Sequence, residues 1–436
     1  MGKITWSYPN KGAVGEKTLR EGLKQLLPEV ERVRSSIQEG GYDSLYASVN
    51  LPDDELSRVE TKRVVEEKKK YKPTMLVVVG IGGSSLGAAA VHQALFGTLY
   101  NDQQPDITFY VADTVDTDYI NDIVLLVEQE LEKGSVVIIN IVSKSGTTIE
   151  TVTNAELFTY LLRKAYPHVY RNYIVITTDE DSELWNYAQE QGITRLAIPK
   201  NVGGRYSVFS SVGLFPLALL GIDIDALCQG ARDMRYRCAL VSDGIVEKIE
   251  KVFENNPAIG RALLLFEYYK RGIAIHDLFV FSKDLSGVGA WYRQLVGESL
   301  GKEGYIEGEI MPVGILPTVS IGTVDLHSVA QLYLGGPPVR FTTFVDIAKN
   351  NTSLVVDGTS MITVMNSIMV AVQKAYYKHN LPFMTLTIPE KNAYHIGGLM
   401  QMHMLEIIYL GFLLGVDPFD QPHVELYKKE VRALLR

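Results

Sequence analysis

From residue 75 onward, short apolar runs alternate with stretches of helical spacing, and this alternation constrains the fold more than any other feature. Continuous apolar runs are typical of strands buried on both faces of a sheet. Their alternation with helices predicts an α/β fold with helices on both faces of a mainly parallel sheet. The first predicted strands are "MLVVVG" (75–80), "ITFYVAD" (107–113), "SVVIIN" (135–140), "YIVITTD" (173–179) and "RLAIP" (195–199), with a helix near 117–132.

A second set of strands is predicted in the later part of the chain, at "DLFVFS" (277–282), "GEIMPVG" (308–314), "VRFTTFVDI" (339–347) and "PFMTLTIP" (382–389). The last segment is predicted to form two helices joined by a proline-containing loop. A chain of 436 residues has room for two such α/β domains. We therefore expect a helical N-terminal segment (1–72), a first αβα domain (73–200), a mostly helical connection (201–270) and a second αβα domain with C-terminal helices (271–436).

Charge and cysteine content narrow the class of protein. The net charge of −9 is spread along the chain and argues against a nucleic-acid partner. Two cysteines cannot form a disulfide framework and indicate buried thiols of a reducing compartment. The N-terminus lacks the apolar stretch of a signal peptide, and the charge-free run 206–222 is too short and too interrupted to span a bilayer. We expect a cytoplasmic protein without a membrane partner, and we interpret the basic run "EEKKKYKP" (66–73) as a solvated helix end.

Two turns that follow predicted strands are unusually polar. Ligands of open parallel sheets bind beyond the carboxyl ends of strands, where helix N-termini point. Close backbone approach, free N–H groups and hydroxyl donors at such a point suit a phosphate. The candidate residues are Gly83 and Ser84 in "GIGGSSLG" (80–87), and Ser143, Lys144, Ser145, Thr147 and Thr148 in "SKSGTT" (143–148).

Neither turn matches the common nucleotide motifs. Ser85 stands where the dinucleotide fingerprint needs its third glycine, and no G-x-x-x-x-G-K-[ST] sequence occurs. A nucleotide cofactor is therefore disfavoured, and a small sugar phosphate fits better. A structural alternative remains open, because Thr147 and Glu150 have the spacing of a capping box. Two such turns after strands of one sheet favour phosphate binding over capping alone.

Five motifs occur in order between residues 80 and 430: "GIGGSSLG", "SKSGTTIET", "GGRYSVFSSVG", "GESLGK" and "FDQPHVELYKK". Together they resemble the glucose-6-phosphate isomerase (phosphoglucose isomerase) family of the shorter bacterial type. The resemblance implies two αβα sandwich domains of the sugar-isomerase (SIS) type in a homodimer. It also implies that a hexose 6-phosphate is the substrate and that neither a metal nor an organic cofactor is required.

The reaction of that family opens the sugar ring and then moves a proton between C1 and C2 through a cis-enediol. It requires a base, a positive charge near the enediolate oxygen, and an acid or base for ring opening. By resemblance, Glu298 in "GESLGK" is the base and Gln294, four residues earlier on the same helical face, contacts the substrate. Arg205 in "GGRYS" stabilises the enediolate. Without the resemblance, Glu298 would be an ordinary helix-end residue and Arg205 a loop cation.

The resemblance also implies two residues for ring opening. His327 in "TVDLHSVAQ" matches the family's ring-opening histidine, which comes from the neighbouring subunit. Lys428 in "HVELYKK" matches the lysine that assists ring opening, although Lys429 lies beside it and the choice between them stays open. Taken alone, His327 would be a structural histidine and the lysine pair a solvated helix face.

Other functions remain in competition with this interpretation. A dual phosphoglucose/phosphomannose isomerase would use the same fold and would also accept the C2 epimer. A non-catalytic sugar-phosphate-binding SIS module would keep both turns, but it would not need Arg205, Glu298, His327 and Lys428 together. A metal-dependent hydrolase is disfavoured for want of a cluster of metal ligands in the sequence. The segment 303–322 matches no motif.

Overall fold

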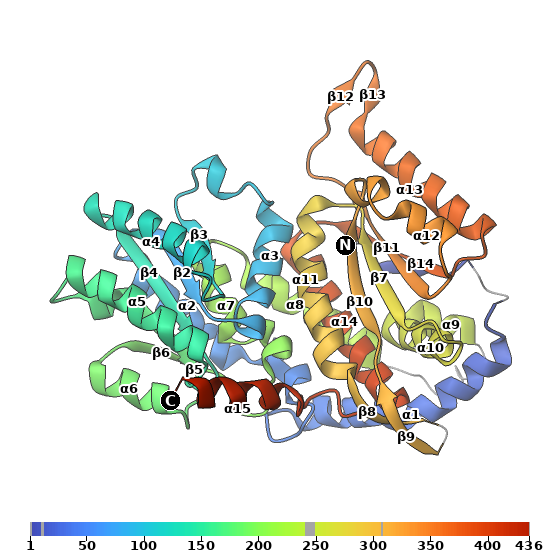
Figure 1. The fold of residues 1–436 in the computed structure, drawn as a ribbon, viewed down its shortest axis with the longest axis horizontal. Coiled ribbons are helices and arrows are strands. Elements are labelled where there is room, and N and C mark those ends of the chain that lie inside the picture. The colour runs from blue at the N-terminus through green and yellow to red at the C-terminus, as the bar shows by residue number, and fades with distance from the viewer. Residues whose placement is uncertain (1, 10–12, 240–248, 307, 436) are drawn as a thin grey trace. The chain divides into compact units, whose positions relative to one another are not determined.

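The computed structural model describes residues 2–9, 13–239, 249–306 and 308–435. They form two compact units, which we call the first unit (Glu39–Gln229) and the second unit (Met1–Gln38 with Gly230–Arg436). Each unit contains a five-stranded sheet with helices packed against it (Figure 1). The expected fold class, an α/β protein with two αβα sandwiches, is confirmed. The domain boundaries suggested by the sequence, at residues 72, 200 and 270, stay predictions.

The sheet of the first unit is entirely parallel and has the order β3-β2-β4-β5-β6. Its central strands are buried on both faces, which explains their continuous apolar sequence. All five strands predicted from the alternation are present. They are β2 (Pro73–Val79), β3 (Thr108–Ala112), β4 (Val136–Val142), β5 (Ile174–Thr178) and β6 (Thr194–Ala197).

Helices cover both faces of this sheet. From β2 the chain moves to β3 on one side, and it later moves through β4, β5 and β6 in the opposite direction. Because parallel crossovers are right-handed, these two directions place the connecting helices on opposite faces. One face carries α2 (Glu55–Lys69), α3 (Leu86–Phe96) and α7 (Ser211–Leu219), and the other carries α4 (Thr117–Glu132), α5 (Ile149–Ala165) and α6 (Glu183–Gln191).

The basic run at the end of α2 is only partly solvated. Lys69 is exposed as expected, but the side chain of Lys68 is fully buried, so the interpretation of a solvated helix end is wrong there. Lys68 Nζ donates to Glu67 Oε1 at 2.8 Å, to the carbonyl oxygen of Asn172 at 2.8 Å and to Thr194 Oγ1 at 2.7 Å. These contacts fix the end of α2 against the segments that begin β5 and β6.

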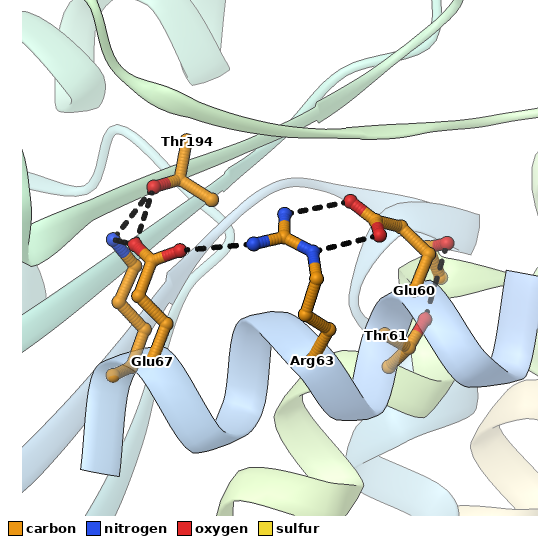
Figure 2. Close-up of polar contacts among 7 residues, drawn as sticks. Glu60, Thr61, Arg63, Glu67 and Thr194 are labelled. Carbon is orange, nitrogen blue, oxygen red and sulfur yellow. Dashed lines mark hydrogen bonds and ion pairs between the residues drawn. The ribbon is translucent and has the colours of Figure 1, made fainter. Parts of the chain in front are cut away.

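An ion-pair chain on the outside of α2 continues from this buried lysine (Figure 2). Arg63 lies between two carboxylates, with its Nη2 2.8 Å from Glu60 Oε1 and its Nη1 3.5 Å from Glu67 Oε2. Thr194 Oγ1 also donates to Glu67 Oε1 at 2.9 Å. Sequence reasoning missed this network because the helical spacing of 66–73 does not show that α2 packs against the strands here.

The sheet of the second unit has the order β1-β14-β11-β7-β10. Four strands of this sheet, β14, β11, β7 and β10, run parallel to one another. β1 lies at the edge beside β14 and runs antiparallel to it. β1 was not expected, because the sequence suggested only helices before residue 72. The strands are β1 (Thr5–Ser7), β7 (Ile275–Val280), β10 (Leu316–Ile321), β11 (Arg340–Lys349) and β14 (Phe383–Glu390).

One predicted strand of this set is present, but its expected place in the sheet is wrong. "GEIMPVG" does not join the sheet, because β9 (Glu309–Val313) pairs antiparallel with β8 (Lys302–Ile306) in a separate hairpin. Ile310 on this hairpin is 76% exposed, so its apolar sequence imitates a core strand. The actual sheet strand is β10, whose hydroxyl groups hide it from a hydrophobicity pattern. Thr318 and Ser320 of β10 donate to the buried carboxylate of Asp277 at 2.6 and 3.0 Å.

The helices of the second unit lie on both faces of its sheet. α10 (Pro257–Lys270) and α14 (Ala393–Leu413) pack together, and α14 also contacts α11 (Ser286–Leu300). α12 (Ala330–Gly335) and α13 (Met361–Lys378) connect the strands in the other direction and cover the opposite face. The two expected C-terminal helices are α14 and α15 (Val424–Leu434). The remaining helices are α1 (Glu16–Glu39), α8 (Ile224–Ala239), which crosses the boundary between the units, and α9 (Ile249–Asn255).

α14 is the one helix of the described residues that is long and apolar enough to cross a membrane. The most apolar 18-residue stretch of α14 is 94% buried inside the protein, so α14 is the core helix of the second unit.

A buried polar network joins α10, α11 and α14 to the sheet. Arg261 of α10 contacts both carboxylate oxygens of Glu406 at 2.9 and 3.0 Å, and His403 Nδ1 lies 2.8 Å from the same carboxylate. Tyr292 of α11 hydrogen-bonds to His276 Nδ1 at 2.9 Å. Each of the five side chains is at most 1% exposed. Loss of one partner would leave a charge or dipole unpaired in the core, which costs several kcal/mol.

Burial controls the protonation of this network. Burial lowers the pKa of His276 to about 3 and also lowers the pKa of His403, although Glu406 opposes the effect in both. Burial would raise the pKa of Glu406, but the attraction of Arg261 and the hydrogen bond from His403 outweigh it and lower that pKa to about 2. Both histidines are therefore neutral at pH 7, and Glu406 is ionised.

We predict that the free energy of unfolding decreases as the pH is lowered from about 6.5 towards 3. In this window the unfolded chain binds protons at its histidines, whereas the native protein keeps His276 and His403 neutral. Each histidine adds a slope of up to about 1.4 kcal/mol per pH unit. Urea unfolding at several pH values measures this pH dependence of the free energy of unfolding. His276→Gln cannot titrate and should show a shallower dependence than the parent, although it is less stable at pH 7; an unchanged slope would contradict the prediction.

Candidate active site

The two polar turns of the first unit lie at the point where the strand order reverses. β2 and β4 are neighbours in the sheet, with Val79 opposite Ile141 at their carboxyl ends. α3 leaves β2 towards β3, whereas α5 leaves β4 towards β5. The two helices diverge, and the turns that precede them open at the same edge of the sheet. This is the usual ligand position of an open parallel sheet.

The turn after β2 packs directly against the loop that carries Arg205. A Cβ atom on Gly83 would lie 2.1 Å from the carbonyl carbon of Gly204 and 2.5 Å from the amide nitrogen of Arg205. Ser207 Oγ donates to the carbonyl oxygen of Gly204 at 2.7 Å and to that of Gly83 at 3.4 Å. Sequence reasoning missed this contact between Gly83 and the loop that carries Arg205.

Ser84 and Arg205 directly follow the two glycines that form this contact. Ser84 ends the short 3₁₀ helix η2 (Gly82–Ser84) and is half-buried, with its amide bonded to Ile81. Arg205 belongs to η5 (Gly204–Phe209) and is 2% exposed. The structure thus brings together the first polar turn and the arginine that the resemblance identified.

The capping alternative for the second turn is wrong. The residue before α5 is Thr148, not Thr147, and its side chain forms no capping hydrogen bond. A capping box between Thr147 and Glu150 is therefore absent. A cap motif would have used the hydroxyl groups to satisfy the amides at the start of α5. Its absence leaves these amides available for another acceptor.

Hydroxyl groups of the second turn organise the backbone around Gly146. Ser143 Oγ accepts a hydrogen bond from the amide of Gly146 at 3.1 Å and donates to Thr148 Oγ1 at 3.4 Å. Ser145 Oγ accepts from the amide and hydroxyl of Thr147 at 3.3 and 3.1 Å. Gly146 has φ +72°, which a residue with a side chain rarely adopts. Ser143 is buried inside the turn, whereas Ser145 and Thr147 are exposed.

Charges around the second turn are partly desolvated. Burial lowers the pKa of Lys144, while the attraction of Asp179 just after β5 opposes it. Burial raises the pKa of Asp113, which follows β3 at the same edge of the sheet. The ends of β3, β4 and β5 therefore each place one ionisable group near the turns. Among the described residues, no group of three or more His, Cys, Asp or Glu side chains could hold a metal ion.

The predicted base and its neighbour are joined in the second unit. Gln294 Nε2 donates to Glu298 Oε1 at 3.0 Å, which confirms that the two side chains share one face of α11. Both are half-buried. α11 is held by its buried face, where Tyr292 enters the polar network described above. The hydrogen bond from Gln294 restrains the Glu298 carboxylate, and the buried face of α11 holds the helix that carries it.

His327 and Lys428 lie on other elements of the second unit. His327 ends η8 (Val324–His327), which follows β10, and it is exposed. Lys428 lies on α15 and forms an ion pair with Glu425 at 2.8 Å, while Lys429 is exposed. Both elements are separate from α11, which carries the Gln294–Glu298 pair.

Comparison with known proteins decides the family. The sequence model of the family described as phosphoglucose isomerase matches residues 66–369. The chain belongs to the phosphoglucose isomerase family. It is 33% identical to a glucose-6-phosphate isomerase of Carboxydothermus hydrogenoformans over 98% of this chain and 92% of that protein. A glucose-6-phosphate isomerase of Symbiobacterium thermophilum is also 33% identical, over 89% of this chain and 86% of that protein.

Solved structures agree on the fold of this isomerase family member. A hypothetical protein from Thermus thermophilus is similar with a TM-score of 0.82 and 30% identity, and the match covers 100% of both chains. A glucose-6-phosphate isomerase from Chlamydia trachomatis has a TM-score of 0.80 at 23% identity, covering 99% of this chain and 88% of that one.

We predict unequal effects for two glycine substitutions in one contact. Gly83→Ala places a methyl group 2.1 Å from backbone atoms of Gly204, which cannot move without displacing Arg205. It should lower the free energy of unfolding by about 1–3 kcal/mol and isomerase activity by at least about tenfold. In Gly204→Ala the new methyl group lies 3.4 Å from Gly83, an ordinary contact, so both losses should be small.

Urea unfolding and a coupled isomerase assay on the two variants measure this difference. Equal losses in both variants, or tolerance of Gly83→Ala, would contradict the assigned packing of the two loops.

Proposed function

We propose that this protein interconverts glucose 6-phosphate and fructose 6-phosphate by ring opening and proton transfer through a cis-enediol. Membership of the phosphoglucose isomerase family supports this activity, as do relatives named glucose-6-phosphate isomerase along nearly their whole length. These relatives do not favour the dual phosphomannose or the non-catalytic alternative. The structural feature that carries the proposal is the pair of polar turns at the strand-order reversal of the first unit.

The phosphate group of the substrate is bound, in this proposal, by the two turns. The hydroxyl groups of Ser145, Thr147 and Thr148 and the uncapped amides at the start of α5 supply hydrogen-bond donors and a positive helix end. Ser143 stabilises the turn from inside, and Gly83, Ser84 and Lys144 complete the anion site. Binding of this unreactive end supplies the energy that orients the reacting carbons.

The chemical step uses Glu298 as the base that moves the proton between C1 and C2. The hydrogen bond from Gln294 fixes the carboxylate, which supports this role because a base must be held within reach of the proton. The buried guanidinium of Arg205 stabilises the negative charge of the enediolate.

Ring opening is assigned to His327 and Lys428, with His327 provided by the second subunit of a homodimer. His327 is exposed, and its surroundings include exposed apolar side chains, Val324 at 60% and Leu332 at 54%. An open apolar cavity of about 360 Å³ lies between α12 and α13 beside this segment. Exposed apolar surface of this kind is typical of a protein interface.

A cytoplasmic location belongs to the same proposal. Both cysteines, Cys228 and Cys238, are buried and neither forms a disulfide. Burial raises the pKa of the Cys238 thiol to about 12, which keeps it protonated and unreactive.

The base assignment predicts the effect of Glu298→Gln. The amide keeps the shape of the side chain but cannot accept a proton, so kcat should fall by at least about a thousandfold. The dissociation constant for fructose 6-phosphate should change by less than about tenfold, because phosphate binding lies elsewhere. A coupled assay and calorimetric titration measure the two quantities.

Glu303→Gln is the matched control, because Glu303 is an exposed glutamate five residues along the chain from Glu298. It should keep full activity. Loss of affinity in Glu298→Gln with turnover intact would refute the assignment.

The composite dimer predicts complementation between two inactive variants. A mixed dimer of Glu298→Gln and His327→Ala subunits contains one site with both residues intact. Random mixing makes half of the dimers mixed, so about a quarter of the parental activity should return. Co-refolding the two variants in equal amounts measures it. If the mixture stays as inactive as its components, His327 does not act across a subunit interface.

A further inference from the structure

Lys302 is a nearly buried cation that joins two distant parts of the second unit. It begins β8, directly after Gly301, the residue that ends α11, and its side chain is 6% exposed. Its Nζ donates to the carbonyl oxygen of Asp417 at 2.6 Å, to that of Asp420 at 2.9 Å and to the carboxylate of Asp420. One ammonium group therefore satisfies three acceptors of the loop that follows α14.

The backbone of the same loop also packs tightly against β8. A Cβ atom on Gly304 would lie 2.4 Å from the carbonyl oxygen of Leu414, and one on Gly415 would lie 2.3 Å from that of Tyr305. Gly415 has φ +67°, which turns the chain away from α14 at this contact. The loop is thus fixed to the strand that continues from the Glu298 helix.

α15 depends on this loop for its position. The helix begins at Val424, four residues after Asp420, and none of its residues is buried. Lys428 and Arg432 both form ion pairs with Glu425 of the same helix. Since α15 fully buries none of its side chains and leaves only three of them half-buried, its direction depends strongly on where the preceding loop is held. Lys428 lies in its second turn.

We propose that Lys302 is a positioning residue for Lys428. By holding the loop at Asp417 and Asp420 against the end of α11, Lys302 sets the place of α15, and hence of the Lys428 ammonium group, relative to Glu298. This inference rests on the proposed function, in which Lys428 assists ring opening. Preorganised placement of a catalytic group by a supporting contact is a common source of rate.

Ring opening can be measured separately from isomerisation in a Glu298→Gln background, where proton transfer at C2 is blocked. Opening and reclosure of glucose 6-phosphate interconvert its anomers, and NMR exchange spectroscopy gives the rate. Lys428→Met should lower this enzyme-catalysed rate by about tenfold or more, and Lys302→Met should lower it by a comparable factor. The exchange rate of the double variant should lie within about twofold of that of Lys428→Met alone, because without Lys428 there is no ammonium group left for Lys302 to position.

Lys68→Met is the matched control. Lys68 is also a buried lysine with three acceptors, but it lies in the first unit at the amino ends of β5 and β6. It should lower thermal stability without changing the anomer exchange rate. Lys302→Arg should restore part of the rate. If Lys302→Met does not fold, Asp420→Asn replaces it, because Asp420 is half exposed and the change weakens the same contact.

The inference is overturned if Lys302→Met leaves anomer exchange at the parental rate. It is overturned as well if the rate of the double variant falls by the product of the two single fold-losses. It is also overturned if Lys428→Met itself has no effect, and the isomerase assignment then still stands on the Glu298→Gln result. Turnover that survives Glu298→Gln would instead refute the proposed function.

Discussion

The divergence of α3 and α5 from neighbouring strands is the constraint on which the proposed substrate site depends. Because α3 leads to β3 and α5 leads to β5, the ends of β2 and β4 share an edge that no connecting helix covers. The chain fills this edge with hydroxyl groups and glycines instead of apolar side chains. Thr148 does not cap α5, and Ser143 supports the turn through the amide of Gly146. These features favour an anion at the start of α5 over a purely structural turn.

The second unit repeats the strand-order reversal with different chemistry. Here β7 and β11 are the neighbours from which the chain diverges, yet the turn after β7 contains Asp284, which forms an ion pair with Lys391. A carboxylate at this position disfavours a phosphate. The Gln294–Glu298 pair instead lies at the opposite end of α11, where a buried polar network holds the helix. In the proposed function, one architecture serves anion binding in the first unit and proton transfer in the second.

The hydrophobic pattern predicted the strands that are apolar along their whole length, and it was misled where a few polar contacts decide the structure. The five strands of the first sheet were predicted because they are buried on both faces. β10 was missed because Thr318 and Ser320 satisfy Asp277 inside the sheet, and the exposed Ile310 made β9 look like a core strand. At the proposed site, the motifs supplied the candidate residues, and helical spacing correctly paired Gln294 with Glu298. The contact of Gly83 with Gly204 and the anchoring by Lys302 join segments far apart in sequence, and no local pattern encodes them.

The most direct test of the account is a crystal structure of the protein with fructose 6-phosphate bound. The account predicts phosphate density within hydrogen-bond distance of the Ser145 and Thr148 hydroxyl groups and of the first amides of α5. Density for the phosphate at the carboxyl ends of β7 and β11, or in the apolar cavity between α12 and α13, would contradict it.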